Sequence, residues 1–259
     1  MMKFLNRLAG RPSAASNRIP VRLWADIVAR MPFLVDLTAA DRDRLHQLAN
    51  DFLAAKQMHG AAGLVLTDEM RVAIAAQACL PILELGLGCY DGWVGVIVYP
   101  SEFRVRREEM DETGVLHQWD EHIAGESMEG GPVVLSWEDA ATEEAGYSVV
   151  IHEFAHKLDG LDGEIDGIPP VPAGTKPDHW RALWRWHFDD FVGLVEADED
   201  SAPFDPYAAS NPAEFFPVMS EAFFTAPEHL NGVYPDLYAG LAVFYRQDPL
   251  ARLNDLNSP

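Results

Sequence analysis

The segment from Val149 to Asp159 constrains the fold most strongly, because it is almost wholly apolar yet carries two histidines and a glutamate. A run this apolar predicts a buried helix. On a helix, His152 and His156 lie about 40° apart and one turn along, so their side chains point toward a common position. This HExxH pattern is typical of zinc peptidases, in which Glu153 would take a proton from a water on the metal without itself being a ligand.

The alternative is a structural helix whose histidines are hydrogen-bonded to neighbouring carbonyl groups. Its apolar residues, among them Ile151, Phe154 and Leu158, make this alternative unfavourable. Burial of two imidazoles and a carboxylate costs free energy unless they have a partner. A metal ion is such a partner, and we therefore favour a metal-binding helix.

Charge and cysteine content narrow the class of protein. The 259 residues include 41 acidic and 19 basic ones, for a formal net charge of -22. A surface this negative argues against nucleic acid or an anionic membrane as the main partner. The N-terminus lacks the apolar core of a secretory signal, and Cys79 and Cys89 form neither a CxxC pair nor a disulfide framework. We therefore expect a cytoplasmic protein.

The order of the predicted elements indicates an α+β fold. We expect a basic, flexible arm at 1–20 and a single domain at 21–259, with a helical portion (21–90) and a catalytic core (91–250). Thr38 and Thr67 are predicted to cap helices of the first portion. The core is predicted to contain strands of one sheet at 94–99, 102–106 and 115–123, a further strand at 132–137, and helices at 178–196, 211–225 and 228–246.

Pro132 begins the last of these strands, and proline cannot donate a backbone hydrogen bond to a neighbouring strand, which favours an edge position. An edge strand beside a metal-binding helix offers unpaired backbone groups to an extended peptide. We therefore predict substrate-binding residues along this strand, with an ordinary edge strand as the alternative. They are Val133, Val134, Leu135, Ser136 and Trp137.

A catalytic zinc ion usually has three protein ligands and one open position, so a third ligand must come from elsewhere. Asp162 is one candidate, because related sites take a ligand six positions after the second histidine. Such sites use a glycine three positions after that histidine to turn the chain, and here that position holds Asp159. The acidic loop around Asp162 is better explained as a solvated turn.

Glu214 and Glu221 are the other candidates, seven positions apart on one face of a predicted apolar helix. Asn211 is the predicted N-cap of this helix, so Glu214 could instead complete a capping box. One carboxylate can bind the metal while the other orients a histidine ligand from behind. The residues alone favour neither assignment.

Four blocks of the sequence, at 130–137, 152–159, 161–170 and 213–224, together resemble the Mlc titration factor A family. These are bacterial cytoplasmic zinc metallopeptidases whose catalytic core is similar to that of anthrax lethal factor. The resemblance runs from about residue 94 to about residue 246. It implies a zincin-like fold with a small mixed sheet, an HExxH helix and a following glutamate-bearing helix, and a peptidase of aminopeptidase type with one Zn²⁺ per chain.

The resemblance also implies a role for each site residue. Tyr207, seven positions before the ligand glutamate, would donate a hydrogen bond to the oxyanion that forms during peptide hydrolysis. Glu221 would then orient a histidine ligand by a hydrogen bond, without contacting the metal itself. The implied zinc ligands are His152, His156 and Glu214, with Glu153 as the general base.

Members of this family have also been linked to binding a sugar-uptake transcriptional repressor. The alternative function is therefore a regulatory protein that sequesters such a repressor and keeps its zinc mainly for structure. Glu153 favours the enzyme, because a purely structural site has no need of it and normally closes its fourth position. Ser148 stands where the family usually has asparagine, just ahead of the metal-binding helix, and serine can still cap that helix. The N-terminal region matches the family poorly, so repressor binding is the property that transfers least.

Overall fold

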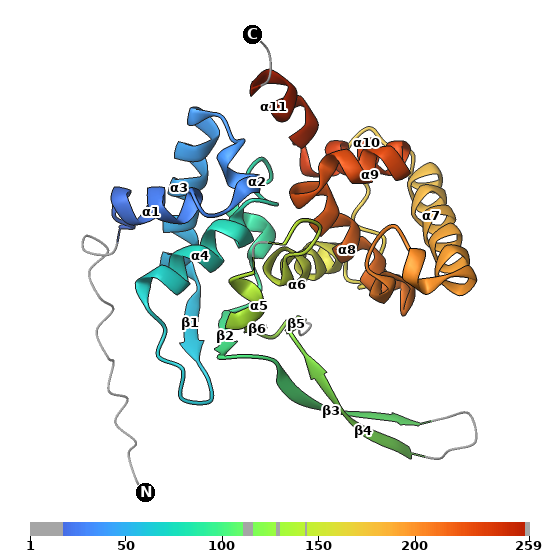
Figure 1. Ribbon diagram of the computed structural model, residues 1–259, viewed down its shortest axis with the longest axis horizontal. Helices are drawn as coiled ribbons and strands as arrows, with labels where there is room; N and C mark the ends of the chain where they lie inside the picture. The colour runs from blue at the N-terminus through green and yellow to red at the C-terminus, as the bar shows by residue number, and fades with distance from the viewer. Residues whose placement is uncertain (1–17, 111–115, 128–129, 143, 257–259) are drawn as a thin grey trace, which may run out of the picture.

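The computed structural model describes residues 18–110, 116–127, 130–142 and 144–256. Most of the predicted basic arm at 1–20 lies outside these ranges. Within them, a small mixed sheet and several helices confirm the α+β class (Figure 1). No helix in the described part of the chain is long and apolar enough to cross a membrane.

The main sheet has four described strands in the order β1-β2-β6-β5. Their bounds are Gln57–Gly60, Gly95–Tyr99, Val133–Ser136 and Gly125–Ser127. The first three are parallel, with Val96 opposite Met58 on one side and Val133 on the other, and β5 pairs antiparallel with β6. Strand β5 is therefore the edge of the sheet on the side of β6.

The predicted edge position of residues 132–137 is wrong. Strand β5 pairs with β6, which becomes an inner strand whose Val133, Leu135 and Ser136 are fully buried. Trp137 lies beyond the strand, in the short helix α5 (Trp137–Ala140). Pro132 is compatible with this position because it directly precedes the strand, where its missing N–H removes no ladder hydrogen bond.

Strands β3 (Phe103–Met110) and β4 (Leu116–Ile123) form a separate antiparallel pair, so the prediction that they belong to the main sheet is also wrong. Figure 1 shows this two-stranded ribbon projecting away from the helices. Strand β4 leads through Ala124 directly into β5. The ribbon is thus continuous with the edge of the main sheet.

The N-terminal portion is helical as predicted, except that the short strand β1 interrupts it. The hydroxyl groups of Thr38 and Thr67 accept hydrogen bonds from the backbone amides of Asp41 and Met70, so both predicted caps are confirmed. The helices of this portion are α1 (Val21–Val28), α2 (Pro32–Val35), α3 (Ala39–Ala55), α4 (Asp68–Cys79) and the 3-10 helix η1 (Leu87–Tyr90).

From residue 177 on, each described α-helix begins with proline, the residue whose fixed φ and missing N–H suit the first helical position. The helix predicted at 228–246 is two helices, because the chain leaves the helical conformation at Tyr234. The α-helices are α7 (Pro177–Ala197), α8 (Pro212–Thr225), α9 (Pro227–Val233), α10 (Pro235–Tyr245) and α11 (Pro249–Leu256). The 3-10 helix η2 (Gly160–Asp162) follows α6 (Val149–Asp159), and η3 (Glu199–Ser201) and η4 (Pro206–Ala209) lie between α7 and α8 in sequence.

Helix α6 (Val149–Asp159) lies between the N-terminal and C-terminal helices and contacts α4, β5, β6 and α8 (Figure 1). Phe154 anchors one side of the helix, with its ring centroid 5.1 Å from that of Tyr90, 5.6 Å from Trp93 and 5.7 Å from Phe52. Aromatic contacts of this kind stabilise a buried helix strongly. They hold α6 so that its two histidines face α8.

Candidate metal centre and its cleft

The start of α6 is fixed by hydrogen bonds of Ser148. Its hydroxyl oxygen accepts a hydrogen bond from the Ile151 amide at 3.2 Å and donates one to Oε1 of Gln77 on α4 at 3.0 Å. Serine therefore fills the N-cap position as predicted. The cap sets the rotation of α6 and so the direction of its imidazoles.

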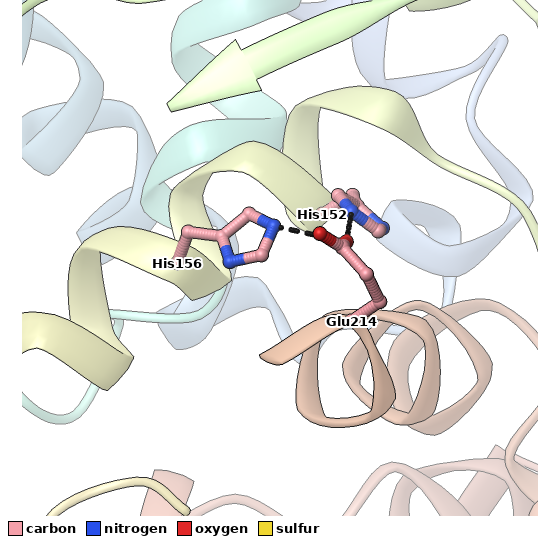
Figure 2. A group of neighbouring side chains, drawn as sticks. All are labelled: His152, His156 and Glu214. Atoms are coloured by element: carbon pink, nitrogen blue, oxygen red, sulfur yellow. Dashed lines mark hydrogen bonds and ion pairs between the residues drawn. The ribbon is translucent and has the colours of Figure 1, made fainter. Parts of the chain in front are cut away.

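Three side chains from two helices converge on one position (Figure 2). The Nε2 atoms of His152 and His156 lie 3.1 and 3.2 Å from the same oxygen, Oε2 of Glu214 in the first turn of α8. One ligand atom from each residue lies within 4.8 Å of the others. The Asn211 side chain caps α8 by accepting from the Ala213 amide, and the Glu214 carboxylate turns to the histidines instead of completing a capping box.

Glu221, two turns further along α8, contacts His152 from the opposite side. Nδ1 of His152 donates to Oε1 of Glu221 at 2.8 Å, and the other carboxylate oxygen accepts from the Ser148 amide at 2.5 Å. A neutral imidazole has only one N–H. With Nδ1 as the donor to Glu221, Nε2 of a neutral His152 presents a lone pair toward the Glu214 carboxylate. Such a contact is favourable only when a positive charge is added, either as a proton on Nε2 or as a metal ion bound by both groups.

The pKa values of His152 and Glu214 also indicate that a positive charge is favoured between these groups. Burial opposes charging of His152, yet its hydrogen bonds to Glu214 and Glu221 raise its pKa well above the ordinary value. Burial would raise the pKa of Glu214, but its hydrogen bonds to the two histidines lower it strongly. A metal ion at the convergence point would supply the same positive charge to two nitrogens and one carboxylate oxygen, which is a donor set that fits Zn²⁺.

Glu153 lies beside this position with only 4% of its surface exposed. Its Oε2 atom has no hydrogen-bond partner among the described residues. Burial, together with the negative charges of Glu214, Glu221 and Glu126, outweighs the opposing effect of His152 and raises the pKa of Glu153 to about 8. The carboxylate is therefore positioned to exchange a proton with a group in the cleft.

Gly125, the first residue of β5, packs directly on Glu153. A Cβ atom at Gly125 would stand 2.6 Å from Cγ and 2.8 Å from Cδ of Glu153, with Oε1 closer still. These separations are far below van der Waals contact, so only glycine allows the strand and the carboxylate to approach in this way. The position of Glu153 thus depends on the backbone of the edge strand.

The three convergent residues lie in a cleft of about 500 Å³. Its walls come from residues 123–127 at the sheet edge, from α6, from the segment around η4 and from α8. Tyr207 of η4 is 47% exposed, and its ring centroid lies 6.1 Å from that of His152. The structure thus brings Tyr207 and all the predicted metal-site residues into one cleft.

Two groups of predicted residues lie elsewhere. Asp162 is exposed on η2, where its side chain accepts a hydrogen bond from the Glu164 amide, and it is not part of the convergent group. Residues 133–137 are not among the described residues that line the cleft. The sheet edge that does line the cleft is β5, which begins with Gly125. Glycine is typical of turns, so the sequence did not predict a strand there.

Sequence reasoning also missed Glu126, Tyr147 and Asp205, which line the cleft from β5, from the residue before the Ser148 cap, and from the loop before η4. Their only sequence signal was their proximity to motif residues. The Asp205 side chain accepts a hydrogen bond from the Tyr207 amide at 2.9 Å, which links the two residues locally. A tertiary structure is needed to place all of them on one cavity.

The sequence matches the family described as glucose-regulated metallo-peptidase M90 over residues 6–246. It is 40% identical over 231 residues to Mlc titration factor A of Pectobacterium atrosepticum, covering 86% of this chain and 85% of that protein. Mlc titration factor A of Serratia proteamaculans is 39% identical over 247 residues, covering 91% and 90% of the two chains. The protein of that name from Yersinia pestis is 38% identical over 231 residues, with 86% and 84% covered.

Proposed function

Because this chain belongs to the glucose-regulated metallo-peptidase M90 family, we propose that it hydrolyses peptide bonds with one Zn²⁺ held by His152, His156 and Glu214. The observation that carries this proposal is the convergence of three ligand atoms in a cleft, beside a buried carboxylate oxygen that lacks a partner. Two histidines and one carboxylate leave a position open for water, as catalytic zinc sites require. A bound zinc ion would polarise the substrate carbonyl group and acidify the attacking water.

The chain's own residues then move the protons. Glu153 takes a proton from the attacking water and delivers it to the leaving amine, acting first as base and then as acid. Oε2 of Glu153 is suited to this role because it makes no hydrogen bond to any described residue. Glu221 keeps His152 in the tautomer whose Nε2 faces the metal, since its carboxylate accepts the Nδ1 proton.

Tyr207 donates a hydrogen bond to the oxyanion that forms when water attacks the carbonyl group. Its position on the cleft wall, with its ring near His152, supports this role. The edge strand β5 holds the substrate in an extended conformation by backbone hydrogen bonds, the role that the sequence suggested for residues 133–137. The approach of Gly125 to Glu153 brings that strand next to the general base.

Within the peptidase class we propose the aminopeptidase type implied by the resemblance. Amino-acid anilides with a free amino group should be cleaved faster than the same anilides after acetylation. Equal rates, or faster cleavage of internally quenched longer peptides, would assign the protein to the endopeptidases.

The decisive experiment compares metal content and peptidase activity in three variants. Glu153→Gln should retain one zinc per chain and lose turnover, because the amide cannot accept the proton. Glu214→Ala should lose zinc, whereas Glu221→Gln should keep it, because that side chain contacts His152 without facing the convergence point. An active Glu153→Gln protein, or zinc lost only from the Glu221 variant, would refute these roles.

The names of the relatives favour a second function, the binding of a transcriptional repressor. A titration factor acts by occupying its partner, which does not require catalysis. Calorimetric titration of purified Mlc repressor with the Glu153→Gln protein tests this function separately from hydrolysis. We expect binding to persist in this variant, and its absence in both the variant and the unchanged protein would exclude the regulatory function for this chain.

A further inference from the structure

A second cavity, of about 610 Å³, adjoins the cleft of the metal centre. The two share four wall residues, Tyr147, Asp205, Val218 and Glu221. Pockets that bind small molecules typically measure about 300–1,000 Å³, so this one can accept a long side chain with its solvent. Because the two cavities share these residues, they lie next to each other, within reach of neighbouring side chains of one bound peptide.

One wall of the second cavity is apolar. It is formed by Val218 and Ala222, both on α8 and both at least 97% buried, and by the partly buried Phe204. These side chains offer van der Waals contact to a hydrocarbon chain and no hydrogen bond. A methylene stem would remove its own apolar surface from water by lying against them.

The rim of the cavity carries negative charge. Glu144 and Asp205 are both exposed there, and the described lining includes neither lysine nor arginine. One oxygen of Asp205 accepts the Tyr207 amide hydrogen bond, which leaves the second oxygen for another donor.

The other polar side chains of the lining have structural partners. Glu221 accepts hydrogen bonds from His152 and the Ser148 amide, and His229 contacts the Pro203 carbonyl through Nε2. Asp205 and Glu144 are therefore the lining carboxylates available to a ligand. An apolar wall with carboxylates at its rim matches a side chain that has a long aliphatic stem and a cationic end.

We propose that the second cavity is a subsite for a lysine or arginine side chain of the substrate, an inference that rests on the proposed peptidase function. The aliphatic stem lies against Val218, Ala222 and Phe204, and the cation pairs with Asp205 and Glu144. A glutamate at the same substrate position is excluded by repulsion from both carboxylates. The subsite thus selects the substrate by one residue near the scissile bond.

The test uses alanine peptides in which one lysine, norleucine or glutamate occupies each position in turn. Each peptide is made with a free and with an acetylated N-terminus, so that aminopeptidase and endopeptidase cleavage are both detected. Norleucine reproduces the aliphatic stem without the charge. At one position the unchanged zinc-loaded protein should cleave the lysine peptide about fourfold to twenty-five-fold more efficiently than the norleucine peptide, as measured by kcat/KM. Each of the two partly exposed ion pairs contributes a factor of about two to five.

Asp205→Asn and Glu144→Gln remove the charges at nearly constant size, and asparagine can still accept the Tyr207 amide hydrogen bond. The lysine-to-norleucine ratio should fall about twofold to fivefold in each variant and approach 1 in the double variant. Asp200→Asn, an equal charge change on η3 outside both cavity linings, is the matched control and should leave the ratio unchanged. Salt at 0.5 M should also lower the ratio, because the rim charges are screened.

Peptide cleavage without a lysine preference at any position, or a preference that survives in the double variant, would overturn the subsite while leaving the peptidase function intact. Failure to cleave any of the peptides in the zinc-loaded state would overturn the peptidase function, and the subsite with it. A preference confined to a free N-terminal amine would show that the cation recognised is the α-ammonium group, and would likewise overturn the side-chain assignment.

Discussion

Replacing Gly125 by alanine should disable Glu153 without touching a metal ligand. The new Cβ would stand 2.6 Å from Cγ and 2.8 Å from Cδ of Glu153, whereas ordinary contacts begin at about 3.4 Å. Glu153 is 96% buried, so it cannot rotate freely into solvent. Its carboxylate or β5 must therefore shift by about 1 Å, and a misplacement of that size can cost about a hundredfold in rate.

The assay is kcat/KM on a peptide substrate, with zinc content measured in the same preparation. We expect a decrease of about a hundredfold at full zinc occupancy, and overpacking should lower the free energy of unfolding by about 1–3 kcal/mol. Gly193→Ala on α7 is the matched control, because a Cβ there meets no heavy atom within 4 Å. That control should keep full activity and gain about 0.5–1 kcal/mol in stability from the lower backbone entropy of its unfolded state.

A second background isolates the contact itself. In a Glu153→Ala protein the clashing side chain is absent, so adding Gly125→Ala should no longer lower the free energy of unfolding. The difference between the two backgrounds measures the coupling of the two positions. Normal kcat/KM in Gly125→Ala, or the same loss of stability in both backgrounds, would refute the claim that β5 positions the general base.

Three further predictions concern the same region. Tyr207→Phe should lower kcat about a hundredfold or more with little change in KM if the phenol contacts the oxyanion, and an unchanged kcat would make it a packing residue. Removal of the metal with a chelator should abolish peptidase activity, and should also lower the melting temperature more in the unchanged protein than in a Glu214→Ala variant, because only the former binds the ion. Burial raises the pKa of Asp159 from 3.8 to about 7, so the folded state binds more protons than the unfolded state between these pH values and stability falls as pH rises through them. Asp159→Asn should therefore equal the unchanged protein below about pH 4 and exceed it by up to about 4 kcal/mol above about pH 8, measured by chemical denaturation, and a constant difference would contradict the assignment.

Local patterns predicted the helices and their caps because these depend on neighbouring residues. Thr38, Thr67, Ser148 and Asn211 all accept the backbone hydrogen bonds that their positions indicated. The HExxH helix was equally accessible, since its spacing alone orients both histidines. Capping and periodicity are short-range effects, and sequence reasoning captures them well.

The sheet was harder to predict from the sequence, because its strands pair with strands that lie far away along the chain. The short β1 has the polar sequence of Gln57–Gly60 and is stabilised by β2, which lies more than 30 positions along the chain. Gly125 gave β5 the composition of a turn, and without β5 the inner strand β6 was predicted to be an edge. Strand pairing depends on which surfaces the tertiary fold leaves to be covered, and local propensity does not determine this.

The choice of Glu214 as the proposed third ligand depends on local spacing and on the tertiary structure together. Glu214 and Glu221 share one helix face, and their spacing could not distinguish a residue in front of His152 from one behind it. The structure places Glu214 at Nε2 of His152 and Glu221 at Nδ1. The difference follows from the crossing of α6 and α8, which the family resemblance anticipated but the residues alone did not.

The hydrogen bond between Gln77 and Ser148 has a consequence for protein engineering. Gln77 lies in α4 and is only 2% exposed, and it also donates to the Ala140 carbonyl at 3.0 Å. Through Ser148 and Glu221 it is connected to His152, so the orientation of a proposed metal ligand depends on a residue of the N-terminal helices. A shortened protein that starts after residue 90 would keep every proposed ligand and the whole HExxH motif, yet it would lose the hydrogen bonds that support His152 from behind. The minimal functional unit of this protein therefore extends well upstream of the residues that carry its chemistry.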